Sequence, residues 1–399
     1  MVQFVKSKMI PVFRKSEDVW ILLAGIVLAL ILRLMLRGYV SGDAQTGSLP
    51  WYEYIESQGG IPALGHAFSG YPPLYLYMMV TAYYVNQLLH ISHLAAIKMI
   101  SIVFDFFAAF WFGKIVQIKY PAKIVSFSAV LAFLFLPTVF MNGAMWGQID
   151  GIFTSFMLAS LYYLLRKRDW LAMVAFGLAL SIKFQAIFMG PFLLVLLLLK
   201  GFRFRTLFIP PLIYFITLLP SWALGRPIEE LLLIYPNQVG SFPNLTLNAP
   251  TFYALIDNSV NYLFNPVGIL LAAVIVMLIV YAVYKLRPRL HLDLMVGMAA
   301  ACLLLLPYIL PKMHERYFYP AEVFFLLFAF YRPRLAFVPV VLQITALVTY
   351  SYYFFGYSFL SLTTDSLIML GLLIYVLYDQ ANRIMESREP ASTPTTGAA

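Results

Sequence analysis

The sequence predicts an all-α protein, a polytopic bundle of about twelve transmembrane helices. Of its 399 residues, 62% are hydrophobic and only 11% are charged, and the mean hydropathy is +0.83. A soluble domain is nearer half apolar and a quarter charged. Runs such as 20–32 and 187–199 contain no charged residue. No water-soluble fold could bury so much apolar surface, so lipid must surround part of it.

Twelve apolar runs define one transmembrane domain, residues 19–385, between a cytoplasmic N-terminal segment (1–18) and a disordered cytoplasmic tail (386–399). The runs between 151 and 200 are short for a hydrocarbon core of ~30 Å, so we expect them to tilt less or to be shielded by protein. In chain order the predicted spans are 18–38, 95–116, 124–141, 151–165, 169–183, 186–200, 206–222, 263–284, 292–310, 317–331, 335–352 and 363–380.

The positions of Lys and Arg predict the orientation of the spans in the plasma membrane. Twenty of the 27 Lys and Arg residues fall on one side of the twelve-span scheme, together with both termini. Cations collect in cytoplasmic loops, so this side is predicted to be cytoplasmic. If the apolar run 71–89 also crossed, the basic loops would face outward. We therefore predict that this run is a helix at the outer surface, starting at Pro72-Pro73. Two long outer loops follow, 41–94 and 223–262, and the first contains no Lys or Arg.

The remaining charges indicate an anionic ligand. A net charge of +9 would suggest nucleic acid in a soluble protein, but the cytoplasmic loops account for it here, so no nucleic-acid partner is predicted. Asp105, inside the second span, is expected to form a structural ion pair or hydrogen bond. Seven cations lie in the outer half, where each alone can extend to lipid phosphate but all together favour an anion site: Arg33, Arg37, Lys98, Lys183, Arg226, Lys312 and Arg316.

No cofactor is predicted. The single cysteine, Cys302, excludes an intrachain disulfide and a cysteine metal site. The sequence has neither an HExxH motif nor an acidic pair at D-x-D spacing, which argues against a resident metal without excluding a divalent cation. Walker and Rossmann motifs are absent, so a soluble nucleotide substrate has no recognisable binding loop.

Three outer segments are more polar than membrane packing requires. In the first, 41–54, Asp43 is either a helix cap or a ligand group, and the neighbouring aromatic residues suit a membrane interface. The second, 142–150, holds Asn, Gln and Asp at a turn between two apolar helices, where Asp150 can both cap a helix and bind a ligand. The third, 235–253, mixes amides with aromatic rings, a composition that suits hydroxyl-rich ligands.

A fourth segment, 311–320, places four ionisable residues between two apolar spans, which is costly in a membrane protein. Here Arg316 and Lys312 are placed to bind phosphate, with Glu315 orienting one of them. The alternative is a self-neutralising ion network. Lys183-Phe184-Gln185 adds polar groups at an outer helix junction.

Together these segments resemble the GT-C superfamily of membrane glycosyltransferases. The chain looks like a bacterial or archaeal relative of the dolichol-linked oligosaccharide glucosyltransferases and the GPI mannosyltransferases, over residues 20–330. The motifs that carry this resemblance are Gly42-Asp43, Tyr71-Pro72-Pro73-Leu74, Asn142-Gly143-Ala144-x-Trp146-Gly147-Gln148-x-Asp150, Lys183-x-Gln185 and Met313-His314-Glu315-Arg316-Tyr317-x-Tyr319-Pro320.

The resemblance implies a GT-C-type bundle and an activity. It implies inverting transfer of a hexose, mannose or glucose, from a polyprenyl-phosphate donor to an acceptor hydroxyl on the extracytoplasmic face. Asp43 would be the general base, with Asp150 as the other candidate. The acceptor would be a lipid-linked glycan, a glycolipid or a protein, and membrane lipids would surround the enzyme. The donor phosphate would meet Lys312, His314, Arg316, Lys183 and Arg37, and the substrate-binding residues would be Asp150, Gln148, Glu315, Gln185, Tyr71 and Asn248.

Two departures and two alternatives accompany this interpretation. Many prokaryotic relatives have Pro at the position of Phe184, and Gly42-Asp43-Ala44 replaces the paired acidic motif of several GT-C branches, which favours a metal-independent member. A transporter would show internal repeats and polar groups near the membrane midplane, and the sequence shows neither. A ligase or polymerase that uses a polyprenyl diphosphate would need the same outer cations, so it stays open.

Overall fold

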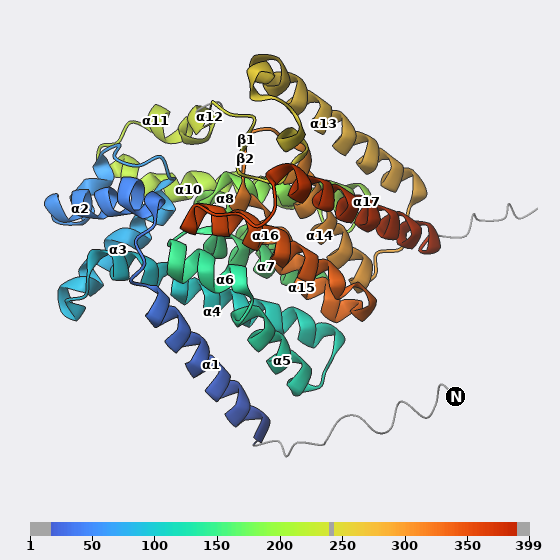
Figure 1. The fold of residues 1–399 in the computed structure, drawn as a ribbon, viewed down its shortest axis with the longest axis horizontal. Helices are drawn as coiled ribbons and strands as arrows, with labels where there is room; N and C mark the ends of the chain where they lie inside the picture. Colours follow the sequence, from blue (N-terminus) through green and yellow to red (C-terminus); the bar gives the residue numbers. More distant parts are fainter. Residues whose placement is uncertain (1–16, 239–242, 389–399) are drawn as a thin grey trace, which may run out of the picture.

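The structure, a computed structural model, describes residues 17–238 and 243–388, and it is helical almost throughout (Figure 1), which confirms the predicted all-α class. A single short parallel ribbon joins β1 (Thr246–Leu247) to β2 (Met313–His314) in these residues. The N-terminal segment before residue 17 and the tail after residue 388 lie outside the described residues. The helices are α1 (Glu17–Leu36), α2 (Leu49–Ser57), α3 (Pro73–Leu89), α4 (His93–Lys119), α5 (Lys123–Leu134), α6 (Pro137–Phe140), α7 (Asp150–Leu165), α8 (Asp169–Ile182), α9 (Gly190–Leu198), α10 (Ile209–Ala223), α11 (Ile228–Leu232), α12 (Ile234–Gln238), α13 (Asn261–Leu286), α14 (Leu292–Ile309), α15 (Tyr319–Tyr331), α16 (Phe337–Phe355) and α17 (Leu362–Glu386).

A helix occupies each of the twelve predicted spans, but not all twelve are of membrane-spanning length. In the described ranges, seven helices are long and apolar enough to cross a membrane, and α5 with the turn after it forms an eighth candidate that is bent by 55°. α7, α8 and the segment Phe184–Leu198 are shorter. A helix of 16 residues such as α7 is only ~24 Å long. Most of α7 is buried against α4 and α8, so protein shields it as expected.

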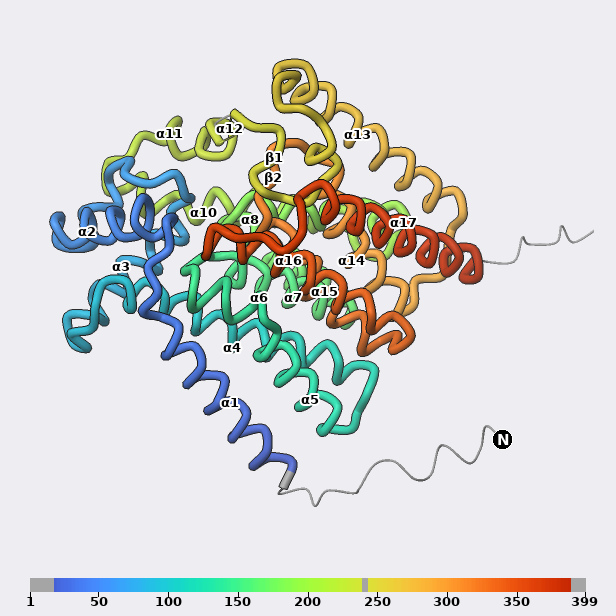
Figure 2. Tube along the Cα trace, in the orientation of Figure 1, coloured from blue at the N-terminus to red at the C-terminus, as the bar shows by residue number. Residues whose placement is uncertain are grey.

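The two ends of the bundle differ as the charge pattern predicts. At one end the basic loops meet: Lys119 Nζ donates to Asp293 at 2.8 and 3.0 Å and to the Tyr331 carbonyl at 2.6 Å, and the Arg289 amide donates to the Ser387 carbonyl. The short helices α2, α3, α11 and α12 lie at the other end, away from the start of α1 and the end of α17 (Figure 2). The basic loops and the long loops therefore occupy opposite ends.

The run 71–89 forms a helix that does not cross the bundle, which agrees with the prediction. Just before α3, the Tyr71 ring lies 5.3 Å from the Trp51 ring. Just after α3, His93 lies 3.4 Å from Glu56. Trp51 and Glu56 both belong to α2, whose nine residues extend only ~13 Å. Both ends of α3 are therefore beside the same short helix, at the same end of the bundle.

Two of the seven outer cations are structural, which corrects their assignment to an anion site. Arg33 Nε donates to Asp105 Oδ2 at 2.8 Å, and its terminal nitrogens donate to the carbonyls of Ala29 and Leu134. Arg33 and Asp105 are both fully buried. This pair confirms the expectation for Asp105. Lys98 is also fully buried, and its Nζ donates to two backbone carbonyls.

Candidate active site

A cavity of about 790 Å³ opens where the long loops meet the ends of α8, α13 and α14. Part of its lining is polar and comes from the four outer segments. Another part is an apolar groove on α13, formed by Ile269, Ala272, Ala273 and Val276, with the polar Asn265 at one end. These positions recur at helical spacing, so they share one face and extend ~17 Å along α13. The cavity therefore combines a charged region with a long apolar channel.

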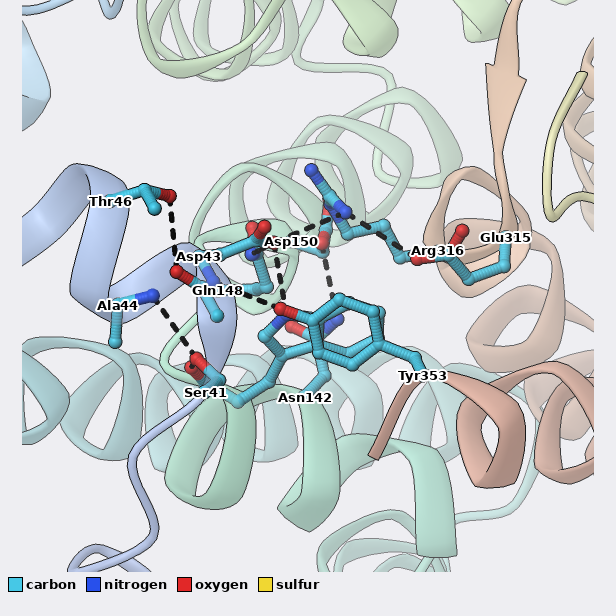
Figure 3. A network of polar contacts seen from close by, with 12 residues as sticks. Ser41, Asp43, Ala44, Thr46, Asn142, Gln148, Asp150, Glu315, Arg316 and Tyr353 are labelled. Carbon is cyan, nitrogen blue, oxygen red and sulfur yellow. Dashed lines mark hydrogen bonds and ion pairs between the residues drawn. The ribbon is translucent and has the colours of Figure 1, made fainter. Parts of the chain in front are cut away.

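Asp43 lies in the polar region, where one of its carboxylate oxygens has three partners (Figure 3). Oδ2 accepts hydrogen bonds from Trp146 Nε1 at 3.0 Å and from Gln148 Nε2 at 2.5 Å, and Arg316 NH1 lies 3.4 Å away. The Asp43 amide donates to the Tyr353 hydroxyl at 3.0 Å. The side chain of Asp43 is 39% exposed. The structure thus brings together a carboxylate and an arginine that are 273 residues apart in the sequence.

The turn that carries Trp146 and Gln148 is built for this contact. A π-helical turn, Met141–Trp146, ends at Gly147, whose φ of +83° is a conformation that favours glycine. A side chain at Gly147 would also approach the Lys98 Cε to 3.2 Å. Gly147 therefore lets the chain reverse so that the side chains on both sides of it reach Asp43.

Buried hydrogen bonds hold this turn against the Asp43 loop. Ser41 Oγ donates to the Trp146 carbonyl at 2.8 Å, and Ser101 Oγ donates to the Gln148 carbonyl at 2.7 Å. Lys98 Nζ joins the two segments by donating to the carbonyls of Tyr39 and Met145. These bonds hold the backbone around the Asp43 carboxylate rigid, and general acid–base catalysis requires such fixed geometry.

Arg316 enters the cavity from the loop between α14 and α15. Its guanidinium lies 3.5 Å from Glu315 Oε1 and 5.4 Å from the centre of the Trp146 ring. Arg316 is only 9% exposed, and in the described part of the chain its Nε has no hydrogen-bond acceptor. A buried guanidinium nitrogen without an acceptor is costly, so this group is suited to an anion from outside the protein.

The segment 245–248 contacts the Arg316 segment and stabilises it. β1 pairs with β2, so that Leu247 lies opposite His314, and the Lys312 amide donates to the Leu245 carbonyl at 2.7 Å. Asn248 continues this pairing with His314, while its side chain donates to the Thr349 carbonyl. Asn248 therefore supports the loop and does not line the cavity.

Burial and charge set the protonation states of this loop. Burial, with the nearby charges of Arg316 and Lys183, lowers the pKa of His314 to about 2, so its imidazole is neutral at pH 7. His314 can offer a hydrogen bond to a phosphate but no positive charge. Burial raises the pKa of Glu315 to about 7, although Arg316 opposes the shift. Burial also opposes the charge of Arg316, but the carboxylates of Glu315 and Asp43 outweigh it and raise the pKa of Arg316.

Asp150 lies behind the cavity wall. It is fully buried and is the first residue of α7, whose N-terminus it does not cap. Lys183 Nζ donates to Asp150 Oδ1 at 2.5 Å, and Asn142 Nδ2 donates to Oδ2 at 3.1 Å. Lys183 does line the cavity. With Asp150 engaged in this way, Asp43 is the one carboxylate among the lining residues that the structure describes.

The structure gathers most of the predicted site residues around one cavity. Arg37, Asp150, Glu315 and Asn248 are not among its lining residues, and neither is the buried Arg226, which lies 3.8 Å from Glu230. The predicted residues that line it are Asp43, Tyr71, Gln148, Lys183, Gln185, Lys312, His314 and Arg316. No group of three His, Cys, Asp or Glu residues in 17–238 and 243–388 could hold a metal ion.

Sequence reasoning missed two contacts of Asp43. Trp146 lies within a quoted motif, but an indole beside a membrane helix is more often an interface anchor. Tyr353 lies near the tyrosine-rich end of α16, and its sequence position does not distinguish it from its neighbours; its contacts with the Asp43 amide and the Trp146 ring do. The groove on α13 carried no signal either, because its residues are apolar like the rest of that helix.

A family model decides the class of the protein. The model of glycosyltransferase family 87 matches residues 68–311, more than half of the chain. The protein belongs to glycosyltransferase family 87. Asp43 and Arg316 both lie outside the matched range, so their roles in this family 87 enzyme depend on geometry alone. The transporter alternative is wrong, because the chain is a glycosyltransferase.

The fold of this family 87 enzyme resembles a solved crystal structure, that of ArnT from Cupriavidus metallidurans bound to undecaprenyl phosphate. The two structures superpose with a TM-score of 0.55, at 12% sequence identity, over 92% of this chain and 78% of ArnT. At this identity the likeness concerns the fold, and it confirms the expected GT-C-type architecture. No curated protein matches the sequence significantly.

Proposed function

We propose that this enzyme transfers a hexose, mannose or glucose, from polyprenyl phosphate to an acceptor hydroxyl on the extracytoplasmic face, with inversion at the anomeric carbon. One observation carries the proposal: Asp43 and Arg316 lie 3.4 Å apart in a cavity that continues as an apolar groove along α13. This arrangement offers a base, a phosphate-binding cation and a lipid channel in one place.

The groove supports a lipid-linked donor. A prenyl chain is apolar and extended, and the α13 face offers ~11 Å of apolar wall, from Ile269 to Val276, beside the charged region. Leu306 and Leu310 of α14 add to that wall. A phosphate at its polar end would meet Arg316, Lys312 and Lys183. The ArnT structure of similar fold holds undecaprenyl phosphate, which is consistent with this donor class.

The proposed reaction is a single displacement. The acceptor oxygen bonds to the anomeric carbon while the bond from that carbon to the phosphate oxygen breaks, and the bonding electrons leave with polyprenyl phosphate. Asp43 takes the hydroxyl proton, which contributes ~10²–10⁴ in rate. Arg316, Lys312 and Lys183 offset the growing charge on the leaving phosphate, so no general acid is required.

The charge distribution supports the extracytoplasmic face. The site lies at the end of the bundle opposite the basic loops, and those loops favour the cytoplasm. The acceptor would then be a lipid-linked glycan, a glycolipid or a protein outside the cytoplasm, with both termini inside. Labelling of a cysteine introduced at exposed Thr46 by a membrane-impermeant reagent in intact cells tests this orientation. A cysteine at Arg166, in a basic loop, is the matched control and should react only after lysis.

A donor panel tests the activity. Purified protein in nanodiscs is incubated with polyprenyl-phosphate mannose, polyprenyl-phosphate glucose, the diphosphate-linked counterparts and sugar nucleotides, with an extract of membrane acceptors. We expect release of polyprenyl phosphate from a monophosphate donor only, and a product whose anomeric configuration is inverted. Turnover of a diphosphate donor alone would favour the ligase alternative, and retention of configuration would contradict the single displacement.

A further inference from the structure

We propose that Trp146 and Gln148 are positioning residues that hold Oδ2 of Asp43 and thereby make Oδ1 the oxygen that accepts the proton. The inference rests on the proposed function, in which Asp43 is the base. It assigns separate tasks to the two oxygens of one carboxylate.

The two oxygens have different surroundings. Oδ2 accepts from Trp146 Nε1 and Gln148 Nε2, and Arg316 lies beside it. Oδ1 accepts no hydrogen bond from any residue that the structure describes, although the side chain is 39% exposed at the cavity. A carboxylate oxygen with several donors has few free lone pairs. Oδ1 is therefore the oxygen that remains available to accept the proton of an incoming hydroxyl.

Both donors are held firmly. Trp146 is 1% exposed and Gln148 is 6% exposed. The Trp146 indole stacks on the Tyr353 ring, with ring centres 4.1 Å apart, and the same Tyr353 accepts from the Asp43 amide. Asp43 is thus fixed at its backbone and at one carboxylate oxygen, and only the second oxygen is left for the acceptor. Fixed geometry of this kind is what makes a general base effective.

The same donors keep Arg316 available for phosphate. An ion pair with good geometry has N–H···O distances of ~2.7–2.9 Å, but Arg316 NH1 stays 3.4 Å from Oδ2. Trp146 and Gln148 occupy the oxygen that a closer ion pair would need, and the Trp146 ring lies 5.4 Å from the guanidinium. The base and the phosphate-binding cation can therefore be neighbours without closing into a short, bidentate ion pair.

Two substitutions remove the donors. Trp146→Phe keeps one aromatic ring, loses Nε1 and leaves unfilled volume, whereas Gln148→Met keeps the chain length and loses the amide. A hydrogen bond to a charged group contributes enough that each variant should lower kcat by about 10-fold or more. The KM of both substrates should stay within about twofold of wild type, because these residues act through Asp43. Tyr39→Phe is the matched control: it removes one hydroxyl, bonded to the Phe354 carbonyl, from the same aromatic cluster, and should keep wild-type kcat.

A double-mutant cycle separates positioning from general structural damage. In an Asp43→Glu background the longer side chain no longer places its carboxylate between the two donors. Adding Trp146→Phe or Gln148→Met should then change kcat by less than about twofold, whereas structural damage would lower it as much as in wild type. Thermal unfolding of each variant is measured in parallel, and if Trp146→Phe does not fold, the Gln148→Met cycle decides.

The outcomes distinguish this inference from the function on which it rests. If Asp43→Asn is inactive but Trp146→Phe and Gln148→Met keep wild-type kcat, the positioning role is wrong and the base remains. Additive losses in the cycle also overturn the positioning role. If Asp43→Asn itself keeps wild-type turnover, Asp43 is not the general base, and both the proposed mechanism and this inference are wrong.

Discussion

Two arginine–aspartate pairs in the same bundle show what separates a structural ion pair from a reactive one. Arg33 and Asp105 are both fully buried and meet at 2.8 Å, and each terminal nitrogen of the guanidinium donates to a backbone carbonyl. Arg316 and Asp43 stay 3.4 Å apart, Asp43 is 39% exposed, and Arg316 Nε lacks an acceptor in the described chain. The first pair is sealed inside the protein, so although Asp105 Oδ1 has no partner among the described residues, no substrate can reach it. The second pair lines the cavity and leaves one nitrogen and one oxygen for a substrate.

The largest effect is expected at the open pair. Asp43→Asn keeps the shape of the side chain but cannot take a proton, so kcat should fall ~10²–10⁴-fold. Binding of polyprenyl phosphate and the melting temperature should change little, because the Asn oxygen still accepts from Trp146 and Gln148. Steady-state transfer with a monophosphate donor measures the loss, and near-normal turnover would rule Asp43 out as the base.

At the closed pair the damage should affect stability. Asp105→Ala leaves a fully buried arginine without its partner, which costs ~3–5 kcal/mol in the free energy of unfolding. Activity per folded molecule should remain. The double variant Arg33→Met with Asp105→Leu removes both charges and should recover most of the stability, because an apolar pair of similar volume is tolerated. Equal stability of Asp105→Ala and wild type would show that the pair is dispensable.

A third substitution compares two buried outer arginines. Arg316→Ala removes a cation from the leaving phosphate, so kcat should fall ~10²–10³-fold. Arg226 is similarly buried, at 3% exposure, but lies beside Glu230 and outside the cavity lining. Arg226→Ala should therefore keep transfer activity per folded molecule. Equal losses in the two variants, measured with the same donor, would remove the special role of Arg316.

The sequence could predict the positions of the helices and the four polar segments, because hydrophobic runs and charge patterns are local properties. It could not separate Arg33 from Arg316, since each is a cation near the outer end of an apolar run. What separates them is a partner on another helix: Asp105 on α4 satisfies Arg33, and the neighbours of Arg316 leave its Nε without an acceptor. For the same reason the sequence predicted Asp150 to be a ligand-binding residue, although its carboxylate accepts a hydrogen bond from Lys183, 33 residues later.

The smallest expected effect concerns Glu315, which borders the open pair. Its pKa is raised from 4.5 to about 7 in the folded protein, chiefly by burial and in part by the carboxylates of Asp43 and Asp150, against the opposing charge of Arg316. Between those two pH values the unfolded chain has released this proton while the folded protein still holds it. Stability should therefore fall as pH rises from about 4.5 to about 7, by at most ~3 kcal/mol.

Glu315→Gln holds a neutral group at this position, so melting curves across that range should become flatter than in wild type. Glu229→Gln, at an exposed acid of the outer loop 223–262, is the control and should leave the slope unchanged. Transfer activity of Glu315→Gln should decline only slightly, because Glu315 lies outside the cavity lining and touches Arg316 from behind. If the melting temperature of Glu315→Gln depends on pH as steeply as that of wild type, Glu315 does not have a raised pKa in the folded protein. Arg316 would then have a second ionised carboxylate, that of Glu315, beside it in addition to Asp43.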